Sequence, residues 1–544
     1  MPEPKWHWVE RFPGMDTETD PLELGAKMMD GEGVMWTNDS LNGYGDGSYW
    51  QVRPGIRLAT GQGTVISAIY ELQRLALSSS TGSRGPDSLV GLSINTDAAN
   101  TVRWTTWSVG TLPAIAVLNT VVAGVNLDTD RRQVFVPAGA LRTMSRQVTQ
   151  AGATQLFVLW NGTAYALGLF TGPTNPDGTF MLAGLAVYHK ERLFLIRNED
   201  PRYGSLVVPS VRGNPLQYVQ GDTFVLDEDS THKIQGGYST GERLILGRSG
   251  SIFMLLGATQ DRNRAVKIST RYGVAGVRGG DLIDYDQLLC FLTESGKPSG
   301  ATQETPSPRN IGIIAGGELR VIGDRVLTDI RASADASRET QVQAWTALRG
   351  ALLIPKRATT AAAVDALFYS TAPRGDPSAG FWKWTLGATV GVCCIREVGG
   401  TMYMGTADVP AASVIKGIKY FDPTLATDNG TAFTARLSSP PYRSSEKKVI
   451  EEMIVVASQT SGTAANWTAQ RRLPSGSYET AFSIVQTGAP TMNAYPQAFR
   501  FKFPTLTSGQ AKADYINGWR INPPADGVGC RIHAVGWSDK GAGG

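Results

Sequence analysis

The sequence is poor in the residues from which disulfide frameworks and metal sites are built. Its 544 residues include four cysteines with no CxxC motif and no paired spacing, which excludes a disulfide framework and a zinc site of the usual kind. Its four histidines lie far apart and form no HxH or HExxH motif. We therefore expect no metal, no cofactor and four buried thiols, at Cys290, Cys393, Cys394 and Cys530.

Charge is also scarce. Charged residues make up 18% of the chain, and 51 Lys and Arg against 48 Asp and Glu leave a net charge of +3. This balance excludes a strongly basic nucleic-acid clamp but allows weak or transient contact with nucleic acid. No apolar run of about 18 residues occurs that could span a membrane, and MPEPKWHWVERF is not a signal-peptide pattern. We expect synthesis and assembly in a reducing cytoplasm.

Glycine and proline are abundant, at 62 and 29 residues, and they separate short apolar runs of β-branched and aromatic residues. These runs occur in pairs around glycine-containing turns, which is the pattern of antiparallel hairpins. Clear examples turn at Asn161-Gly162, Gly250, Gly316-Gly317 and Gly399-Gly400. One short helix is expected around residues 138–150. The chain is otherwise predicted to be all-β.

The spacing of the hairpins indicates the architecture. Hairpins without intervening helices exclude a parallel α/β sheet. Residues 55–435 hold too many hairpins for one sandwich, and they suit a β-propeller, whose blades take about 40–50 residues plus insertions. We predict about six blades, with the ring closed by the strand after Gly63. Residues 1–54 are predicted to form an extended aromatic-rich arm, and residues 436–544 a C-terminal antiparallel β-sandwich.

The aromatic residues of the arm need a surface on which to pack. Trp6, Trp8 and Phe12 belong to a segment rich in Gly, Asp, Pro and Asn, which cannot build a core alone. In one interpretation these side chains pack on their own domain. In the other they contact a neighbouring subunit, and both interpretations stay open at this point.

One inter-strand region collects basic residues. Binding of nucleic acid requires a basic face with aromatic residues, and the best candidate in this chain is the set Arg262, Arg264, Lys267, Arg271 and Arg278. These side chains either are solvated loop charges or contact DNA. The sequence alone does not decide between the two interpretations.

No constellation of catalytic residues stands out in the sequence. It contains no GxSxG elbow and no phosphate-binding P-loop, and it lacks the repeated Ser-x-Asp-x-Gly-x-x-Trp turn of sugar-cleaving propellers. Asp281, Asp284 and Asp286 form a local acidic cluster, which solvated turn charges explain better than paired catalytic carboxylates. We therefore expect that the protein is not an enzyme.

The segment from Gly241 to Ile330 resembles a known family. It contains KISTRYGVAGVRGG, LIDYDQLLCFLTESG and GELRVIGDRVLTDI in succession. Together with DPLELGAKMM, the triplet Arg53-Pro54-Gly55 and LAVYHKERLFLIRNEDP at 185–201, these motifs are similar to the tail-nozzle, or packaged-DNA stabilisation, β-propeller proteins of short-tailed bacteriophages. The resemblance covers residues 20–430 as short motifs and does not include the C-terminal domain.

The resemblance implies a structural component of the virion tail, assembled in the host cytoplasm. Proteins of this kind form a ring, often six-fold, below the connector and adaptor of the particle. There they retain or guide the packaged genome and seat distal tail parts. For this chain the resemblance implies a ring of identical subunits, expected to be a hexamer, with contacts to other tail and adaptor proteins and transient passage of double-stranded DNA.

A second hypothesis is a carbohydrate-binding or depolymerising receptor-binding tail protein with a propeller fold. Its basis is a group of tryptophans that would form a sugar-binding surface if they were exposed, namely Trp104, Trp107, Trp382 and Trp384. Core packing is the simpler interpretation of the same residues.

Overall fold

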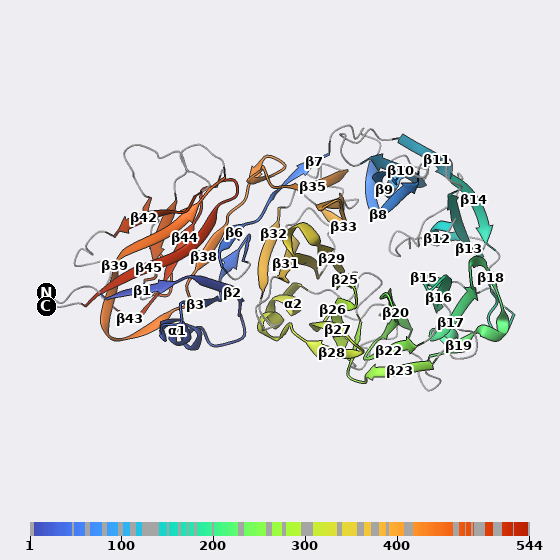
Figure 1. The fold of residues 1–544 in the computed structure, drawn as a ribbon, viewed down its shortest axis with the longest axis horizontal. Coiled ribbons are helices and arrows are strands. Elements are labelled where there is room, and N and C mark those ends of the chain that lie inside the picture. The colour runs from blue at the N-terminus through green and yellow to red at the C-terminus, as the bar shows by residue number, and fades with distance from the viewer. Residues whose placement is uncertain are drawn as a thin grey trace.

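The computed structural model shows a chain built mainly of β-strands, arranged as a ring of sheets beside a two-sheet sandwich (Figure 1). This arrangement confirms the predicted all-β class and the β-propeller. The structure describes residues 5–45, 48–59, 66–78, 84–95, 102–108, 116–121, 141–149, 152–160, 165–170, 173–178, 181, 183–198, 201–226, 233–256, 264–274, 279–294, 308–333, 340–355, 364–371, 380–387, 391–406, 417–460, 467–473, 475–479, 482–483, 495–503, 514–525 and 527–541.

Seven sheets follow one another around the ring in the part of the chain that the structure describes, where the sequence predicted about six blades. We number them in chain order. Sheet 1 contains β8 (Ile66–Ser78), β9 (Arg84–Asn95), β10 (Val102–Ser108) and β11 (Ala116–Val121), and sheet 2 contains β12 (Leu141–Thr149), β13 (Gly152–Trp160) and β14 (Tyr165–Phe170). Sheet 3 contains β15 (Ala183–His189), β16 (Arg192–Asn198), β17 (Leu206–Val211), β18 (Asn214–Tyr218) and β19 (Phe224–Val225). Sheet 4 contains β20 (Ile234–Ser239), β21 (Leu244–Arg248), β22 (Ser251–Leu256) and β23 (Arg264–Ser269).

Sheets 5 to 7 complete the ring. Sheet 5 contains β24 (Tyr272–Val274), β25 (Gly280–Asp284), β26 (Gln287–Glu294), β27 (Asn310–Ala315) and β28 (Glu318–Val321). Sheet 6 contains β29 (Gln341–Trp345), β30 (Gly350–Ile354), β31 (Val364–Ser370) and β32 (Phe381–Leu386). Sheet 7 contains β33 (Val392–Val398), β34 (Thr401–Thr406), β35 (Ile418–Asp422), β7 (Gly55–Leu58), β36 (Thr427–Asp428) and β37 (Thr431–Ala432). Within the described residues of these seven sheets, every strand pairing is antiparallel except one parallel bridge between β36 and β7.

The middle strands of these sheets are apolar on both faces because each sheet packs between two others. All five residues of β21 are buried, and so are all five of β30 and six of the eight in β26. Separate hydrophobic clusters fill the spaces between sheets 3 and 4 and between sheets 4 and 5. This explains why the sequence shows continuous apolar runs there, whereas a sheet covered on one face alternates apolar and polar residues.

The ring closes through a strand from near the start of the chain. β7 pairs antiparallel with β35, so that Ile56 lies opposite Phe421, and β33 of the same sheet lies against β8 of sheet 1. The prediction that the strand after Gly63 closes the ring is therefore wrong. That strand, β8, instead begins sheet 1. The four residues of β7 close the ring, because they pair with the edge of β35 in sheet 7.

The C-terminal sandwich is formed by two sheets. The first contains β42 (Gln497–Lys502), β39 (Tyr442–Ser458), β45 (Arg531–Gly541), β6 (Trp50–Val52) and β5 (Gly43–Gly45), with β1 (Trp6–Val9) on β45 and β43 (Asp514–Asn517) on β39. The second contains β4 (Ser40–Leu41), β38 (Arg436–Ser438), β44 (Trp519–Asn522), β40 (Thr468–Arg471) and β41 (Phe482–Ser483). In chain order, the first strand of the sandwich after the ring is β38, which begins at Arg436.

The N-terminal segment is not an extended arm, because its strands complete the sandwich. β1, β5 and β6 join the first sheet and β4 joins the second, while β2 (Arg11–Met15) and β3 (Val34–Thr37) pair in parallel. Gaining regular partners satisfies the backbone groups that an isolated extended segment would leave to water. The predicted arm is therefore corrected to a set of strands shared with the C-terminal domain.

Helices are short in the described residues. They are α1 (Pro21–Met29), α2 (Leu327–Ser333), and the 3-10 turns η1 (Pro201–Tyr203), η2 (Gln220–Asp222), η3 (Asp324–Val326) and η4 (Thr346–Leu348). The Asp20 side chain caps α1 by accepting the Leu22 amide at 2.7 Å. Gly25 lets the helix lie against β39, since a Cβ there would overlap the carbonyl oxygen of Pro441. The helix expected around 138–150 is wrong, because that region contains β12.

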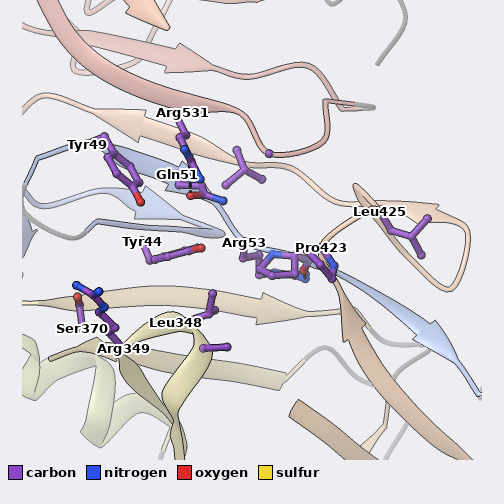
Figure 2. Close-up of a pocket in the computed structure, with 14 residues that line it drawn as sticks. Tyr44, Tyr49, Gln51, Arg53, Leu348, Arg349, Ser370, Pro423, Leu425 and Arg531 are labelled. Atoms are coloured by element: carbon purple, nitrogen blue, oxygen red, sulfur yellow. Dashed lines mark hydrogen bonds between the residues drawn. The ribbon is translucent and has the colours of Figure 1, made fainter. Parts of the chain in front are cut away.

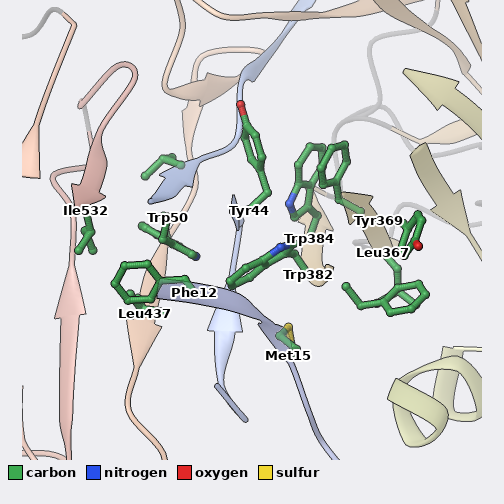
Figure 3. Packing of buried hydrophobic residues seen from close by; sticks show 14 of the residues in the cluster. Phe12, Met15, Tyr44, Trp50, Leu367, Tyr369, Trp382, Trp384, Leu437 and Ile532 are labelled. Carbon is green, nitrogen blue, oxygen red and sulfur yellow. The ribbon is translucent and has the colours of Figure 1, made fainter. Parts of the chain in front are cut away.

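One hydrophobic core joins the sandwich to the ring. Figure 3 shows Phe12 and Trp50 on the sandwich side, Tyr44 between, and Trp382 and Trp384 from β32 of sheet 6. The side chains of Phe12, Trp50, Trp382 and Trp384 are fully buried. Burial rules out Trp382 and Trp384 as a sugar-binding surface, so the use of these two residues in the second hypothesis is wrong. Trp104 and Trp107 have side chains outside the described part of the structure.

Candidate functional site at the junction of the two domains

A buried arginine holds the junction together. Arg53 follows β6 and precedes β7, so it stands where the chain passes from the sandwich to the ring. Its guanidinium donates to Asn42 Oδ1 at 2.9 Å, to the Pro54 carbonyl at 2.9 Å and to the Thr385 carbonyl at 3.0 Å. It also donates to both carboxylate oxygens of Asp428, at 3.0 and 2.7 Å. All five N–H donors of the side chain are thus used.

The partners of Arg53 come from separate parts of the fold. Asn42 Oδ1 also accepts the Thr385 amide of sheet 6 at 2.8 Å, and Asn42 Nδ2 donates to the Thr434 carbonyl at 2.8 Å. The Phe433 ring lies 3.9 Å from the Arg53 guanidinium carbon. Because both members of the ion pair are buried and fully hydrogen-bonded, the network fixes the two domains relative to each other.

A pocket of about 440 Å³ lies next to this network, which is a size suited to a small molecule (Figure 2). Strands β5, β6 and β45 of the sandwich form one side. The η4 turn with Arg349 after it, and the end of β31, both from sheet 6, form the other side, with the loop after β35 at one end. The residues that surround it are Tyr44, Tyr49, Gln51, Val52, Arg53, Pro54, Ala347, Leu348, Arg349, Ser370, Pro423, Leu425, Gly529 and Arg531.

Aromatic contacts hold the two tyrosines of the pocket in place. The Tyr44 ring packs on Phe368 and Trp384, with centroids 5.1 and 5.9 Å apart. The Tyr49 ring lies 5.9 Å from His533 and 4.9 Å from the guanidinium carbon of Arg531. Tyr44 is therefore held by packing across the two domains and Tyr49 by packing within the sandwich, so the wall that they form exists before a ligand binds.

Two further arginines face each other across the pocket. Arg531, from the sandwich, donates from Nε to Gln51 Oε1 at 2.9 Å. Arg349, from sheet 6, is exposed and has a left-handed backbone at φ 49°. Its carbonyl accepts both the amide and the hydroxyl of Thr371, at 2.8 and 2.6 Å, which fixes the turn. Among the described residues, neither guanidinium has an acidic partner, and no Asp or Glu lines the pocket.

Two ionisable groups with shifted pKa values lie in the ring outside the pocket, the buried Lys419 and the half-buried Asp281. Burial lowers the pKa of Lys419 on β35 to about 7, although Asp428 opposes the shift. Asp281 of sheet 5 accepts the Ala344 amide at 2.8 Å and the Gln343 amide group at 2.6 Å, both from sheet 6. Burial raises its pKa despite the opposing effect of Arg396. The interpretation of Asp281 as a solvated turn charge is wrong, because it joins neighbouring sheets.

Two residues of the predicted basic set, Arg264 and Lys267, lie on the edge strand of sheet 4. Arg264 begins β23, and Lys267 is exposed on the same strand, which is the last of its sheet. Arg271 is exposed and donates to Glu294 at 3.0 Å. Arg262 and Arg278 lie outside the described residues. A DNA contact through this set stays a prediction, and none of these residues is part of the junction pocket.

The predicted subunit-contact residues differ in exposure. Trp8 is 41% exposed on β1, and its ring stacks with that of Trp6 at a centroid distance of 6.2 Å. Phe12 is fully buried in the shared core of its own chain. The assignment of Phe12 to a subunit contact is therefore wrong, whereas that of Trp6 and Trp8 stays a prediction.

Among the residues that the structure describes, no group of three or more His, Cys, Asp or Glu side chains is placed to hold a metal ion. No helix in this part of the chain has the length and hydrophobicity needed to cross a membrane. The sequence did not predict the junction pocket, because the residues that line it are scattered along the chain from Tyr44 to Arg531.

Comparison with known proteins finds similarity at the level of structure. No protein-family model matches the chain, and no curated protein matches its sequence. Among solved structures, it is similar to PorZ, a surface component of the type-IX secretion system of Porphyromonas gingivalis (9% identity, TM-score 0.32), covering 79% of this chain and 46% of that one. It is also similar to Kluyvelomyces marxianus Hsv2 (9%, 0.32; 62% and 88% covered) and to the Myceliophteria thermophila Cps50 (Swd1) β-propeller domain (13%, 0.33; 64% and 99% covered). Similarity at this level does not indicate a function for this chain.

Proposed function

We propose that this chain is a structural component of a bacteriophage tail, resembling the nozzle ring that extends the DNA channel, retains the packaged genome and seats distal tail parts. The sequence motifs that support the proposal occupy sheets 4 and 5 and continue through α2. The similar motif at 185–201 occupies the β15–β16 hairpin of sheet 3. The motifs thus belong to consecutive sheets of the propeller.

The observation that carries the proposal is the way in which the chain couples its two domains. Residues 6–58 supply β1, β4, β5 and β6 to the sandwich and β7 to the ring. The Arg53 network holds the chain in place where it passes from the sandwich to the ring. A part that seats other proteins in a particle must hold its surfaces at fixed positions. A shared core and a buried ion pair provide such rigidity, which an enzyme with a hinged lid does not require.

Self-association is the first test. We expect the purified full chain to form a closed ring of identical subunits, visible by negative-stain electron microscopy and measured by mass photometry. Replacing the exposed Trp8 by serine should reduce ring formation, whereas replacing the exposed Tyr285, which lies in the β25–β26 turn, should not. A chain that stays monomeric, and that cryo-electron microscopy does not find in purified particles, would overturn the proposal.

DNA passage is the second test. A channel wall that let the genome pass would make few Lys or Arg contacts to phosphate, so we expect the purified ring to bind double-stranded DNA weakly and with little dependence on salt. Replacing Lys267 and Arg271 by glutamine should weaken this binding further if sheet 4 contacts DNA. Strong, salt-dependent retention of DNA by the purified ring would contradict a role in DNA passage.

A further inference from the structure

We propose that the junction pocket binds an anionic monosaccharide unit, that is, a sugar ring bearing a carboxylate or a phosphate. The inference rests on the pocket alone and is independent of the proposed tail function. Its volume of about 440 Å³ lies in the range of small-molecule sites. On the sandwich side Tyr44 and Tyr49 are held by the packing described above, and on the sheet 6 side the turn at Arg349 is fixed by its hydrogen bonds with Thr371, so that little ordering would accompany binding.

The charge of the pocket points to an anion. Three arginines line it, and the described lining contains no acidic residue. Asp428 neutralises Arg53, and the other hydrogen bonds of Arg53 use up its donors, so this side chain supports the wall without reaching the ligand. The cations available to a ligand are Arg349 and Arg531. Guanidinium groups present forked donors that match carboxylate and phosphate oxygens.

The remaining lining suits a hydroxylated ring. Tyr44, Tyr49 and Ser370 carry hydroxyl groups, and Gln51 carries an amide, in the space between the two arginines (Figure 2). Aromatic rings offer apolar faces to the C–H face of a sugar while their hydroxyl groups exchange hydrogen bonds. This combination of polar and aromatic groups distinguishes the site from one for a bare inorganic anion.

The two available arginines belong to different domains. Arg349 lies on sheet 6 of the ring, whereas Arg531 begins β45 of the sandwich. A ligand bound by both would bridge the domains in addition to the Arg53 network. Because a ligand that binds only the folded state stabilises it by mass action, binding should raise the midpoint of thermal unfolding.

The experiment uses the full chain with isothermal titration calorimetry and thermal unfolding. The probes are glucuronic acid, glucose 6-phosphate, glucose and inorganic phosphate at millimolar concentration. We expect glucuronic acid or glucose 6-phosphate to bind and to raise the unfolding midpoint, with glucose at least about tenfold weaker. The stronger of the two charged sugars identifies the oxyanion.

The variants are Arg349→Asn, which suits the left-handed backbone, and Arg531→Gln. Each should weaken binding about 10-fold or more, since hydrogen bonds to charged groups are the strongest available here. Arg531→Lys keeps the charge but loses the fork and should give an intermediate affinity. Arg212→Gln, which removes an exposed arginine from sheet 3, is the matched control and should bind as the unchanged protein does.

The inference would be overturned if neither charged sugar bound, or if glucose bound as tightly as the charged sugars. It would also be overturned if a variant that lacks both arginines kept its unfolding midpoint and still bound the charged sugars. Inorganic phosphate binding as tightly as glucose 6-phosphate would indicate an adventitious ion only.

Discussion

Arg53 shows how a single side chain can connect two domains. Its guanidinium touches Asp428 and Thr385 of the ring and Asn42 of the N-terminal segment, and it is fully buried. A buried ion pair stabilises little compared with an apolar pair of the same shape, but removing one partner leaves a buried charge uncompensated. The role of Arg53 is thus to specify the junction more than to add net stability.

We predict that Arg53→Met lowers the free energy of unfolding by about 3–5 kcal/mol, because Asp428 would keep its charge without a partner. The double variant Arg53→Met/Asp428→Leu should recover part of this loss. Urea denaturation followed by tryptophan fluorescence measures both. The exposed pair of Arg212 and Glu191 is the control, for which removal of the arginine should cost about 0–1 kcal/mol. Equal costs for Arg53 and Arg212 would contradict the assigned role.

His189 connects sheets 3 and 4, since its Nδ1 lies 2.8 Å from Ser239 Oγ. Burial lowers its pKa to about 4, Lys190 adds to the lowering, and Glu242 opposes it. The unfolded chain has a His pKa near 6.5, so between these values the unfolded state holds a proton that the folded state does not. The stability that depends on neutral His189 is therefore complete above about pH 6.5 and is lost as pH falls toward 4.

We predict that the unchanged protein loses about 2 kcal/mol more of its unfolding free energy between pH 7.5 and pH 5 than His189→Gln does. Urea denaturation at the two pH values gives the difference directly. The variant removes the titrating group while keeping an amide that can bond to Ser239. An equal loss in both proteins would show that the pKa of His189 does not differ between the folded and unfolded states.

At the scale of the element, β7 decides whether the ring is closed. Four residues, Gly55–Leu58, complete sheet 7 by pairing with β35. Gly55 begins this strand in a tight space, because a Cβ there would lie 2.5 Å from the carbonyl oxygen of Thr427. A short strand can have this importance because it covers an edge whose backbone groups would otherwise be unpaired.

We predict that Gly55→Val destabilises the protein by about 1–3 kcal/mol, since the added side chain would displace β7 from β36 and from Leu425 before it. Hydrogen exchange should show loss of protection in β35 as well as in β7. Gly221→Ala is the control, because no atom lies within 4 Å of a Cβ at that position. Protection in β35 that is unchanged by Gly55→Val would argue against closure by this strand.

At the scale of the whole molecule, the chain folds as two domains that share one segment. The sandwich takes β1, β4, β5 and β6 from residues 6–52, and its core is continuous with that of sheet 6. Its strands from residues 436–541 alone would leave β45 and β38 with open edges and would expose apolar residues of the core.

We predict that a fragment of residues 436–544 does not fold on its own, and that co-expression with residues 1–54 increases its soluble yield. Circular dichroism and gel filtration of the fragment, with and without its partner segment, provide the measurement. For the same reason the full chain should unfold in a single calorimetric transition. A fragment that folds alone, or two well-separated transitions in the full chain, would contradict the prediction.

The sequence by itself determined the local architecture. Glycine turns such as Gly316-Gly317, which both have positive φ, set the hairpins, and runs such as Leu288 to Leu292 became strands buried on both faces. Such features are local, because turn conformation and apolar periodicity depend on a few neighbouring residues. The same locality produced the error at residues 141–149, where pairing with β13 prevailed over a short helical pattern.

Only the tertiary structure decided which distant strands meet. The pairing of β7 with β35, the passage of the N-terminal segment into the sandwich and the pocket between Arg349 and Arg531 join residues hundreds of positions apart. Open strand edges carry the same backbone donors and acceptors, so the partner of an edge is chosen by shape and burial in the folded molecule. That choice leaves no mark in the sequence near either strand.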